Sequence, residues 1–235
     1  MSEKRLALVT GGAHRVGAAI ARRLAAAGFH VVISYYRNKD KALNATREIA
    51  GDAIEADFSR EGEGARLAAT VMERFGRCDV LVNNASLYKP DKACANALAE
   101  HVRVNAEAPA ALIDGLASAL RRHGGGYVVN MIDLLAERPM RDYSGYCASK
   151  AALANLTLAK ARQLAPAVTV NGISPGVVAW PDNYPLDDRE AYLAKVPLAR
   201  PGTPEDVAAL AHFLVTEGTY ITGQIIRLDG GRSLV

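Results

Sequence analysis

The stretch RLALVTGGAHRVGAAIARRLAAAGFHVVI, residues 5–33 of the 235-residue chain, decides the fold. Arg5 to Val9 is a short apolar run that ends in a glycine-rich turn, as buried parallel strands do. Apolar residues then recur one helical turn apart from Val16 to Leu24, and Gly28 supplies the left-handed residue with which helices commonly end. Residues 29–33, Phe-His-Val-Val-Ile, form a second strand, so the chain begins with a β-α-β unit.

The same alternation of strands and helices continues along the chain. We expect helices at 39–50, 64–75, 98–104, 108–122, 144–164 and 204–215, and strands at 53–56, 79–83, 126–132, 168–173 and 224–228. This alternation predicts one α/β domain over residues 1–235, a Rossmann-type doubly wound parallel sheet of about seven strands with helices on both faces. Residues 177–201 hold four prolines and the only tryptophan, Trp180, and we expect them to form an irregular substrate loop or lid.

Composition excludes several classes of function. The net charge is +3 and basic residues are scattered, so a nucleic-acid partner is not expected. No run of about 18 apolar residues could cross a membrane, and the first residues are too soon glycine-rich for a secretory signal, so a cytoplasmic protein is expected. The three cysteines form no Cys-x-x-Cys and the five histidines match no metal-ligand spacing, so neither a disulfide framework nor a metal site is expected.

The turn from Thr10 to Gly17 predicts a dinucleotide site. Glycines let the backbone approach a pyrophosphate, which a helix N-terminus attracts through its N–H groups and its dipole. Arg15 replaces one glycine of the usual pattern, and its charge could reach a phosphate or the substrate. After the second strand, NAD-dependent enzymes carry an acidic residue for the ribose 2′-hydroxyl. Arg37 and Asn38 suit a 2′-phosphate instead, which predicts NADPH, unless Arg37 is a solvated turn residue.

A second pattern predicts acid–base chemistry at one edge of the sheet. Tyr146 and Lys150 are four residues apart on an expected helix, so their side chains share a face. An ammonium group close to a phenol favours the phenolate, and the pair would make a proton donor that works near neutrality. Asp133 follows the strand at 126–132, and strand ends are where open α/β sheets bind ligands. A Tyr-x-x-x-Lys pattern also occurs by chance, so its weight depends on the other motifs.

Taken in order, the motifs resemble those of the short-chain dehydrogenase/reductase superfamily over essentially the whole chain. The positions that match its cofactor-binding and catalytic motifs are Gly11, Arg15, Val16, Gly17, Asp57, Asn84, Ala85, Asn105, Tyr146, Lys150, Pro175, Gly176 and Asp229. The resemblance implies NADPH or NADP+ as the cofactor, with further contacts from Tyr35, Phe58 and Ser86. It also implies that Asn105 organises a proton relay, and that a homotetramer is built on the helices at 108–122 and 144–164.

At two positions the chain departs from the usual superfamily pattern, and there it is similar to pteridine reductases and bacterial dihydromonapterin reductases. Asp133 stands where most members carry a serine that donates a hydrogen bond to a substrate carbonyl. A carboxylate would repel the oxyanion formed from a ketone, but it can help relay a proton to the nitrogen of a C=N bond. The second departure is Arg15, which occurs together with Ser86 and Tyr88. The resemblance implies that Ser86 contacts cofactor and substrate and that Tyr88 covers the pterin ring.

The sequence therefore predicts an NADPH-dependent reductase that converts a dihydropterin, such as dihydromonapterin or dihydrobiopterin, to the tetrahydropterin. The expected catalytic residues are Asp133, Tyr146, Lys150 and Asn105, and the expected substrate contacts are Arg15, Ser86, Tyr88, Asp133, Tyr146 and Trp180. Two alternatives stay open. One is a reductase of the same fold for a ketone, a quinone or another imine. The other is a non-catalytic NADPH-binding sensor, which would not need the complete set of Tyr146, Lys150 and Asn105.

Overall fold

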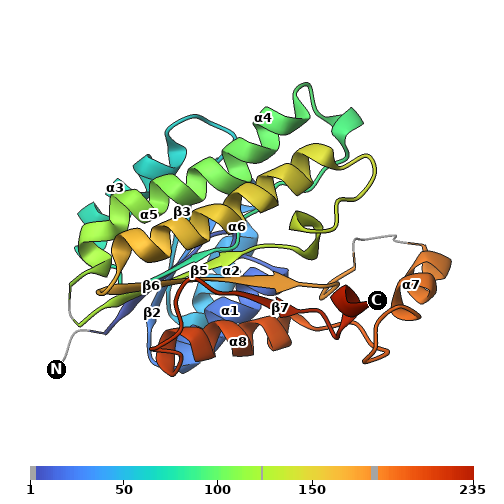
Figure 1. Ribbon diagram of the computed structural model, residues 1–235. Coiled ribbons are helices and arrows are strands. Elements are labelled where there is room, and N and C mark those ends of the chain that lie inside the picture. Colours follow the sequence, from blue (N-terminus) through green and yellow to red (C-terminus); the bar gives the residue numbers. More distant parts are fainter. Residues whose placement is uncertain (1–3, 123, 181–184) are drawn as a thin grey trace.

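A seven-stranded parallel sheet forms the centre of the molecule (Figure 1). The computed structural model describes residues 4–122, 124–180 and 185–235. The strand order is β3-β2-β1-β4-β5-β6-β7, and every neighbouring pair is parallel. The strands are β1 (Leu6–Val9), β2 (His30–Tyr35), β3 (Asp52–Glu55), β4 (Val80–Asn83), β5 (Gly126–Met131), β6 (Val168–Pro175) and β7 (Ile225–Leu228). The predicted doubly wound sheet is confirmed.

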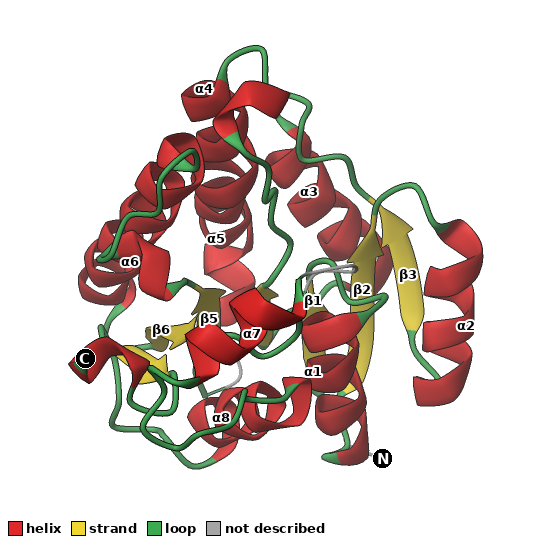
Figure 2. Ribbon diagram, turned by 90° about the vertical axis from the view of Figure 1, so that its right-hand side faces the viewer, coloured by secondary structure: helices red, strands yellow, loops and turns green. Residues whose placement is uncertain are grey.

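Helices cover both faces of the sheet in two layers (Figure 1). One layer contains α3 (Glu63–Phe75), α5 (Ala108–Leu120) and α6 (Ser144–Leu164), and the other contains α1 (Arg15–Ala26), α2 (Lys39–Ile49) and α8 (Pro204–Thr216). Two shorter helices are α4 (Ala97–Val102), which leads into α5, and α7 (Leu186–Leu193). Figure 2 looks toward the carboxyl ends of the strands and shows α7 in front of the sheet.

The strands are continuously apolar because each sheet face is covered. Along β1, Leu6 and Leu8 pack with α3 and α5, whereas Ala7 and Val9 pack on the opposite face with α1 and α8. All four side chains are buried. This two-sided burial is why the strands lack the alternation of apolar and polar residues that half-exposed strands show. No helix among residues 4–122, 124–180 and 185–235 is both long and apolar enough to span a membrane.

Two segments differ in detail from the expectation. The helices expected at 98–104 and 108–122 are joined by a π-helical turn, Arg103–Glu107, so the chain stays helical from α4 through α5. The expected irregular loop at 177–201 contains the eight-residue helix α7, while part of it, 181–184, lies outside the described residues. None of the α7 side chains is fully buried, so it has no apolar stripe from which a helix could be predicted.

Candidate active site

The loops after β1 and β4 are tied together where the strand order reverses. The Thr10 hydroxyl oxygen accepts hydrogen bonds from the main-chain N–H groups of Asn84 and Ala85, both at 2.9 Å. The Asn84 side-chain amide donates to the main-chain oxygens of Thr10 at 2.8 Å and Gly11 at 3.2 Å. In open α/β sheets this reversal is the usual place for a dinucleotide. The two loops therefore form one rigid floor for a ligand.

Glycines bring the first turn of α1 close to this floor. Gly11 has a φ of +63°, which side-chain-bearing residues rarely adopt. A Cβ at Gly17 would lie 2.3 Å from the main-chain oxygen of Gly11 and 2.6 Å from the Asn84 amide nitrogen. Val16 and Gly17 follow Arg15, an exposed residue with φ +49° that begins α1. No acidic residue lies in the first turn, so the turn suits an anionic pyrophosphate.

A cavity of about 340 Å³ opens beside this turn. Among the predicted cofactor contacts, those that line it are Gly11, Tyr35, Arg37, Asp57, Phe58, Ala85 and Ser86. Three charged residues that the sequence did not single out also line it: Lys89, Glu100 and Arg103. Glu100 and Arg103 are three residues apart within one continuous helical segment, so their side chains share a helix face. That spacing was the only feature of the sequence that could have grouped them. The residues that line the cavity come from the end of β2 and from the segments that follow β1, β2, β3 and β4.

Arg37 lines the cavity and has a left-handed backbone conformation, with φ +68°. Its guanidinium is exposed and sits 4.6 Å from the centroid of the Tyr36 ring. The side-chain oxygen of Asn38 is committed elsewhere, because it caps α2 by accepting a hydrogen bond of 3.0 Å from the main-chain N–H of Lys41. The Asn38 side chain thus already serves as a helix cap, whereas Arg37 is one of the residues that line the cavity.

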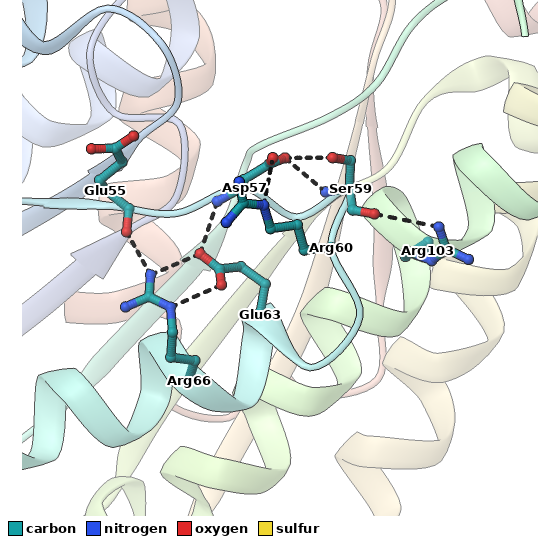
Figure 3. Close-up of polar contacts among 7 residues, drawn as sticks. All are labelled: Glu55, Asp57, Ser59, Arg60, Glu63, Arg66 and Arg103. Carbon is teal, nitrogen blue, oxygen red and sulfur yellow. Dashed lines mark hydrogen bonds and ion pairs between the residues drawn. The ribbon is translucent and has the colours of Figure 1, made fainter.

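Asp57 is held in place by a network of charged side chains (Figure 3). Its carboxylate accepts hydrogen bonds from the main-chain N–H of Ser59 at 3.1 Å and from the Ser59 hydroxyl at 2.6 Å. The main-chain N–H of Asp57 donates to the Glu63 carboxylate at 2.9 Å. The two Glu63 oxygens in turn accept hydrogen bonds from Nε and Nη2 of Arg66. The main-chain oxygen of Ser59 accepts from Arg103 at 3.3 Å. The turn after β3 is therefore held by contacts within the protein.

Asp133 and Tyr146 are joined directly. The Tyr146 hydroxyl donates to Asp133 Oδ2 at 2.7 Å, and Asp133 Oδ1 accepts the main-chain N–H of Leu135 at 2.9 Å. Burial raises the pKa of Tyr146 well above the usual tyrosine value, and the adjacent Asp133 charge and hydrogen bond raise it further. These directions oppose the expectation that Lys150 favours the phenolate, because the Tyr146 hydroxyl is paired with a carboxylate.

Lys150 makes its hydrogen bond to the main chain at the end of β5. Its Nζ donates a hydrogen bond of 2.8 Å to the main-chain oxygen of Met131 and lies 5.7 Å from the centroid of the Tyr146 ring. The side chain is almost completely buried, and burial lowers the pKa of Lys150 to about 8, with the Asp133 charge opposing that shift. The helical spacing of four residues does bring the two side chains to one face. It does not determine which oxygen the ammonium group contacts.

Asn105 lies in the π-helical turn, a type of irregularity that is frequent at functional sites. Its side-chain oxygen accepts from the main-chain N–H of Leu87 at 2.7 Å and from the Ser86 hydroxyl at 3.1 Å. Its amide donates to Leu87 and, at 2.9 Å, to Ser149 Oγ, which in turn donates to the main-chain oxygen of Tyr146. Asn105 thus connects the loop after β4 to α6, and its side chain is fully used by these contacts.

Tyr88 forms one wall beside the Asp133–Tyr146 pair. Its ring stacks on Tyr143, with centroids 4.7 Å apart and an interplanar angle of 19°. It also meets the Tyr146 ring edge to face, at 4.8 Å and 83°. The Tyr88 side chain is 44% exposed, so one part of the ring is open to a ligand. The sequence did not predict Tyr143 as part of this aromatic wall.

A second wall comes from the segment after β6. Pro175 ends the strand, and the N–H of Gly176 donates to the main-chain oxygen of Leu228 at 3.0 Å. Trp180 meets the ring of Tyr192 edge to face at 5.5 Å. The Tyr192 hydroxyl accepts a hydrogen bond of 3.2 Å from the main-chain N–H of Val177. Tyr192 was not among the predicted site residues, because a single tyrosine in an irregular segment carries no motif.

Comparisons with known proteins agree over nearly the whole chain. Residues 11–233 match the family model described as enoyl-(acyl carrier protein) reductase. Pteridine reductase 1 of Leishmania tarentolae is 35% identical, covering 97% of this chain and 96% of that protein. Dihydromonapterin reductase of Enterobacter sp. (strain 638) is 33% identical with the same two coverages. A 3-oxoacyl-[acyl-carrier-protein] reductase of Staphylococcus epidermidis is 31% identical, covering 96% of this chain and 97% of that protein.

A solved structure gives the same result at the level of the fold. The crystal structure of acetoin dehydrogenase from Salmonella typhimurium superposes with a TM-score of 0.89 at 29% identity, covering 99% of this chain and 97% of that one. The pterin reductases and the ketoacyl reductase are similar to this chain to nearly the same degree, so these likenesses define the reaction class more sharply than the substrate. The chain belongs to the short-chain dehydrogenase/reductase family and is an oxidoreductase.

Proposed function

We propose that the protein is an NADPH-dependent reductase that converts a dihydropterin to the tetrahydropterin by reducing a C=N bond. The observation that carries the proposal is the 2.7 Å hydrogen bond from the Tyr146 hydroxyl to the Asp133 carboxylate. A carboxylate at this position disfavours an oxyanion but tolerates a nitrogen that gains a proton. The likeness to pteridine reductase 1 and dihydromonapterin reductase supports the same substrate class.

The state of Tyr146 suits a proton donor. Because burial and Asp133 raise its pKa, the phenol keeps its proton at neutral pH and can give it to a substrate nitrogen. NADPH, when bound, supplies the hydride that the neighbouring carbon accepts. Loss of the proton would leave a phenolate beside Asp133, which is unfavourable, so Tyr146 must be reprotonated promptly. Lys150 is a buried cationic side chain whose Nζ lies 5.7 Å from the centroid of the Tyr146 ring, and its lowered pKa would let it release a proton.

The remaining catalytic roles are assigned from their contacts. Asn105 fixes the start of α6 through Ser149, and a proton relay at this point would use its main-chain oxygen, since its side chain is fully hydrogen-bonded. Lys150 would also orient the nicotinamide ribose from the floor of the site. These assignments make Asp133, Tyr146, Lys150 and Asn105 one unit that spans β5, α6 and the π-helical turn.

The cofactor preference rests on charge. Arg37, Lys89 and Arg103 bring three cations to the cavity lining, against the two carboxylates of Asp57 and Glu100. A 2′-phosphate is doubly charged near neutrality and is held well by a guanidinium. The cradle of Gly11 and Gly17 would receive the pyrophosphate. Tyr35, Asn38, Asp57, Phe58, Asn84, Ala85 and Ser86 would then surround the adenosine half and the phosphates.

The substrate would lie between the nicotinamide and Tyr88. Offset stacking on an aromatic ring contributes about 0.5 to 1.5 kcal/mol beyond burial, and Tyr88 keeps part of its ring exposed. Trp180 stands on the opposite segment, so residues 177–201 would act as the substrate loop or lid. Arg15 and Ser86 would contact the polar edge of the pterin near the phosphates. A homotetramer on α5 and α6 belongs to the same proposal.

The test is the rate of NADPH oxidation with dihydromonapterin and dihydrobiopterin, measured beside NADH and a panel of ketones and quinones. We expect turnover of the dihydropterins with NADPH and little turnover otherwise. A 3-oxoacyl substrate belongs in the panel, because the likeness to a 3-oxoacyl-[acyl-carrier-protein] reductase favours carbonyl reduction as the second candidate. Turnover of that substrate without turnover of any pterin would overturn the pterin assignment.

A further inference from the structure

Tyr192 touches the turn that follows β6, although it lies on α7. Its hydroxyl oxygen accepts a hydrogen bond of 3.2 Å from the main-chain N–H of Val177. The same oxygen is 3.2 Å from the position that a Cβ would take on Gly176. The Asp229 Cα is about as close, 3.1 Å from that Cβ position, so the Tyr192 hydroxyl and Asp229 together leave no space for a side chain at Gly176. The turn has little room to move while Tyr192 stays in place.

The ring of Tyr192 is itself held on two sides. Trp180 meets it edge to face at 5.5 Å, and the Arg232 guanidinium carbon lies 5.5 Å from its centroid. A guanidinium over an aromatic face is attracted by the electrons of the ring. Burial raises the pKa of Tyr192, which keeps the hydroxyl neutral. Tyr192 thus connects the substrate loop to the segment that contains Arg232.

The segment that carries Arg232 is anchored independently of Tyr192. The Asp229 carboxylate accepts hydrogen bonds from the N–H groups of Gly231 at 3.0 Å and Ser233 at 2.7 Å. Arg138, which follows the Asp133 turn, donates to the main-chain oxygen of Arg232 at 2.9 Å. These contacts fix the main chain around Arg232, and the Arg232 guanidinium itself donates a hydrogen bond of 3.0 Å to the main-chain oxygen of Val235.

We propose that Tyr192 is a positioning residue for hydride transfer, which fixes the Pro175–Val177 turn through its hydroxyl and is itself oriented by Arg232. This inference rests on the nicotinamide-dependent oxidoreduction of the proposed function, with the nicotinamide at this turn, and does not depend on the pterin. Reacting carbons must lie within a few tenths of an ångström of the productive distance, so a small shift of the turn slows the chemistry far more than it weakens cofactor binding.

The first experiment compares Tyr192→Phe with Tyr220→Phe. The Phe substitution at 192 keeps the ring that packs on Trp180 and Arg232 and removes only the hydroxyl that binds the Val177 N–H. Tyr220 is fully exposed and serves as the matched control. We expect kcat of Tyr192→Phe to fall about tenfold or more while its cofactor KM changes less than about twofold. A Tyr192→Phe protein with the kcat of Tyr220→Phe would overturn the proposal.

Arg232 is tested by a double-mutant cycle. If Arg232 acts by orienting the Tyr192 hydroxyl, Arg232→Gln should lower kcat in the wild-type background and have no further effect in the Tyr192→Phe background. Arg232→Lys keeps a cation and should recover part of the loss. Full additivity of Arg232→Gln and Tyr192→Phe would overturn the role of Arg232, because the two side chains would then act independently.

The pterin assignment and the positioning role of Tyr192 are contradicted by different results. The kinetic comparison uses whichever pterin or carbonyl substrate the wild-type protein reduces, so a wrong pterin assignment does not affect it. Binding of reduced cofactor also gives a readout without any substrate, since nicotinamide fluorescence increases when the ring is held in a fixed environment. That increase should be smaller for Tyr192→Phe than for Tyr220→Phe at equal occupancy. Equal increases together with equal kcat values would leave Tyr192 without a positioning role.

Discussion

The hydroxyl of Tyr146 on α6 and the carboxylate of Asp133 after β5 share a hydrogen bond of 2.7 Å. The two residues are thirteen positions apart, and only the packing of α6 against the end of β5 brings them together. Burial and the Asp133 charge both raise the pKa of Tyr146, which favours the protonated hydroxyl. A protonated, positioned hydroxyl is what a general acid requires.

Asp133→Asn should abolish most turnover. The amide keeps the shape of the side chain but removes the charge, so the proton is no longer stabilised on Tyr146 in the same way, and we expect kcat to fall about 100-fold. Cofactor affinity should stay nearly unchanged, because Asp133 does not line the 340 Å³ cavity. Steady-state kinetics and cofactor titration measure both quantities.

Asp142→Asn is the matched control for that change. Asp142 is exposed and has φ +63°, a conformation that asparagine tolerates, so this variant should behave as the wild type. In Asp133→Asn the tyrosine should also ionise at a lower pH, since the carboxylate charge that raises the pKa of Tyr146 is gone. An Asp133→Asn protein with full activity would exclude Asp133 from the chemistry.

Arg37→Asn should weaken the preference for NADPH. Asparagine tolerates the left-handed conformation at φ +68°, so the substitution removes the charge without straining the turn. Loss of a guanidinium–phosphate contact is worth about 1.5 to 3 kcal/mol, which predicts a KM for NADPH roughly tenfold or more above that of the wild type. The KM for NADH should change little. Equal effects on the two cofactors would mean that Arg37 does not read the 2′-phosphate.

The fold was predictable because its signals are local. Each strand is a short apolar run between a helix end and a turn, and two-sided burial makes those runs continuous. The π-helical turn at Arg103–Glu107 and the helix α7 were not predictable for the same reason. A π turn arises from one extra residue within a helix, and α7 has no buried face to leave a pattern in the sequence.

The sequence could suggest which residues belong to the candidate site, but not what they contact. Asp133 could be placed because strand ends of open α/β sheets bind ligands, whereas Asn84 was placed by its resemblance to a family motif. The partner of Lys150 could not be predicted, because side-chain spacing does not decide between the Tyr146 hydroxyl and the main-chain oxygen of Met131. Tyr192 and Arg232 are forty residues apart, and their contact exists only through the tertiary fold.

Tyr88→Leu should raise the KM for the dihydropterin. Leucine fills part of the volume but cannot stack on a flat heteroaromatic ring, which costs about 0.5 to 1.5 kcal/mol and predicts an increase of roughly two- to tenfold. Tyr88→Phe keeps the ring and its stacking on Tyr143, so its KM should stay close to that of the wild type. Steady-state kinetics at saturating cofactor measure both. A phenylalanine variant as impaired as the leucine variant would assign the effect to the hydroxyl and not to stacking.

Lys150→Met should change how stability depends on pH. Burial lowers the pKa of Lys150 to about 8 in the folded protein, whereas a lysine in the unfolded chain titrates near 10.4. Between these values the unfolded state holds a proton that the folded state has lost, so the free energy of unfolding rises with pH. Below about pH 8 both states are protonated, and the cost of burying the charge is constant.

Urea unfolding of the wild type and of Lys150→Met at about pH 7.5 and 9.5 tests this. The wild type should gain stability relative to the variant as the pH rises. Lys195→Met, at an exposed position, is the control. Identical pH slopes for wild type and Lys150→Met would contradict a neutralised Lys150, and with it the proposed supply of a proton from Lys150 to Tyr146.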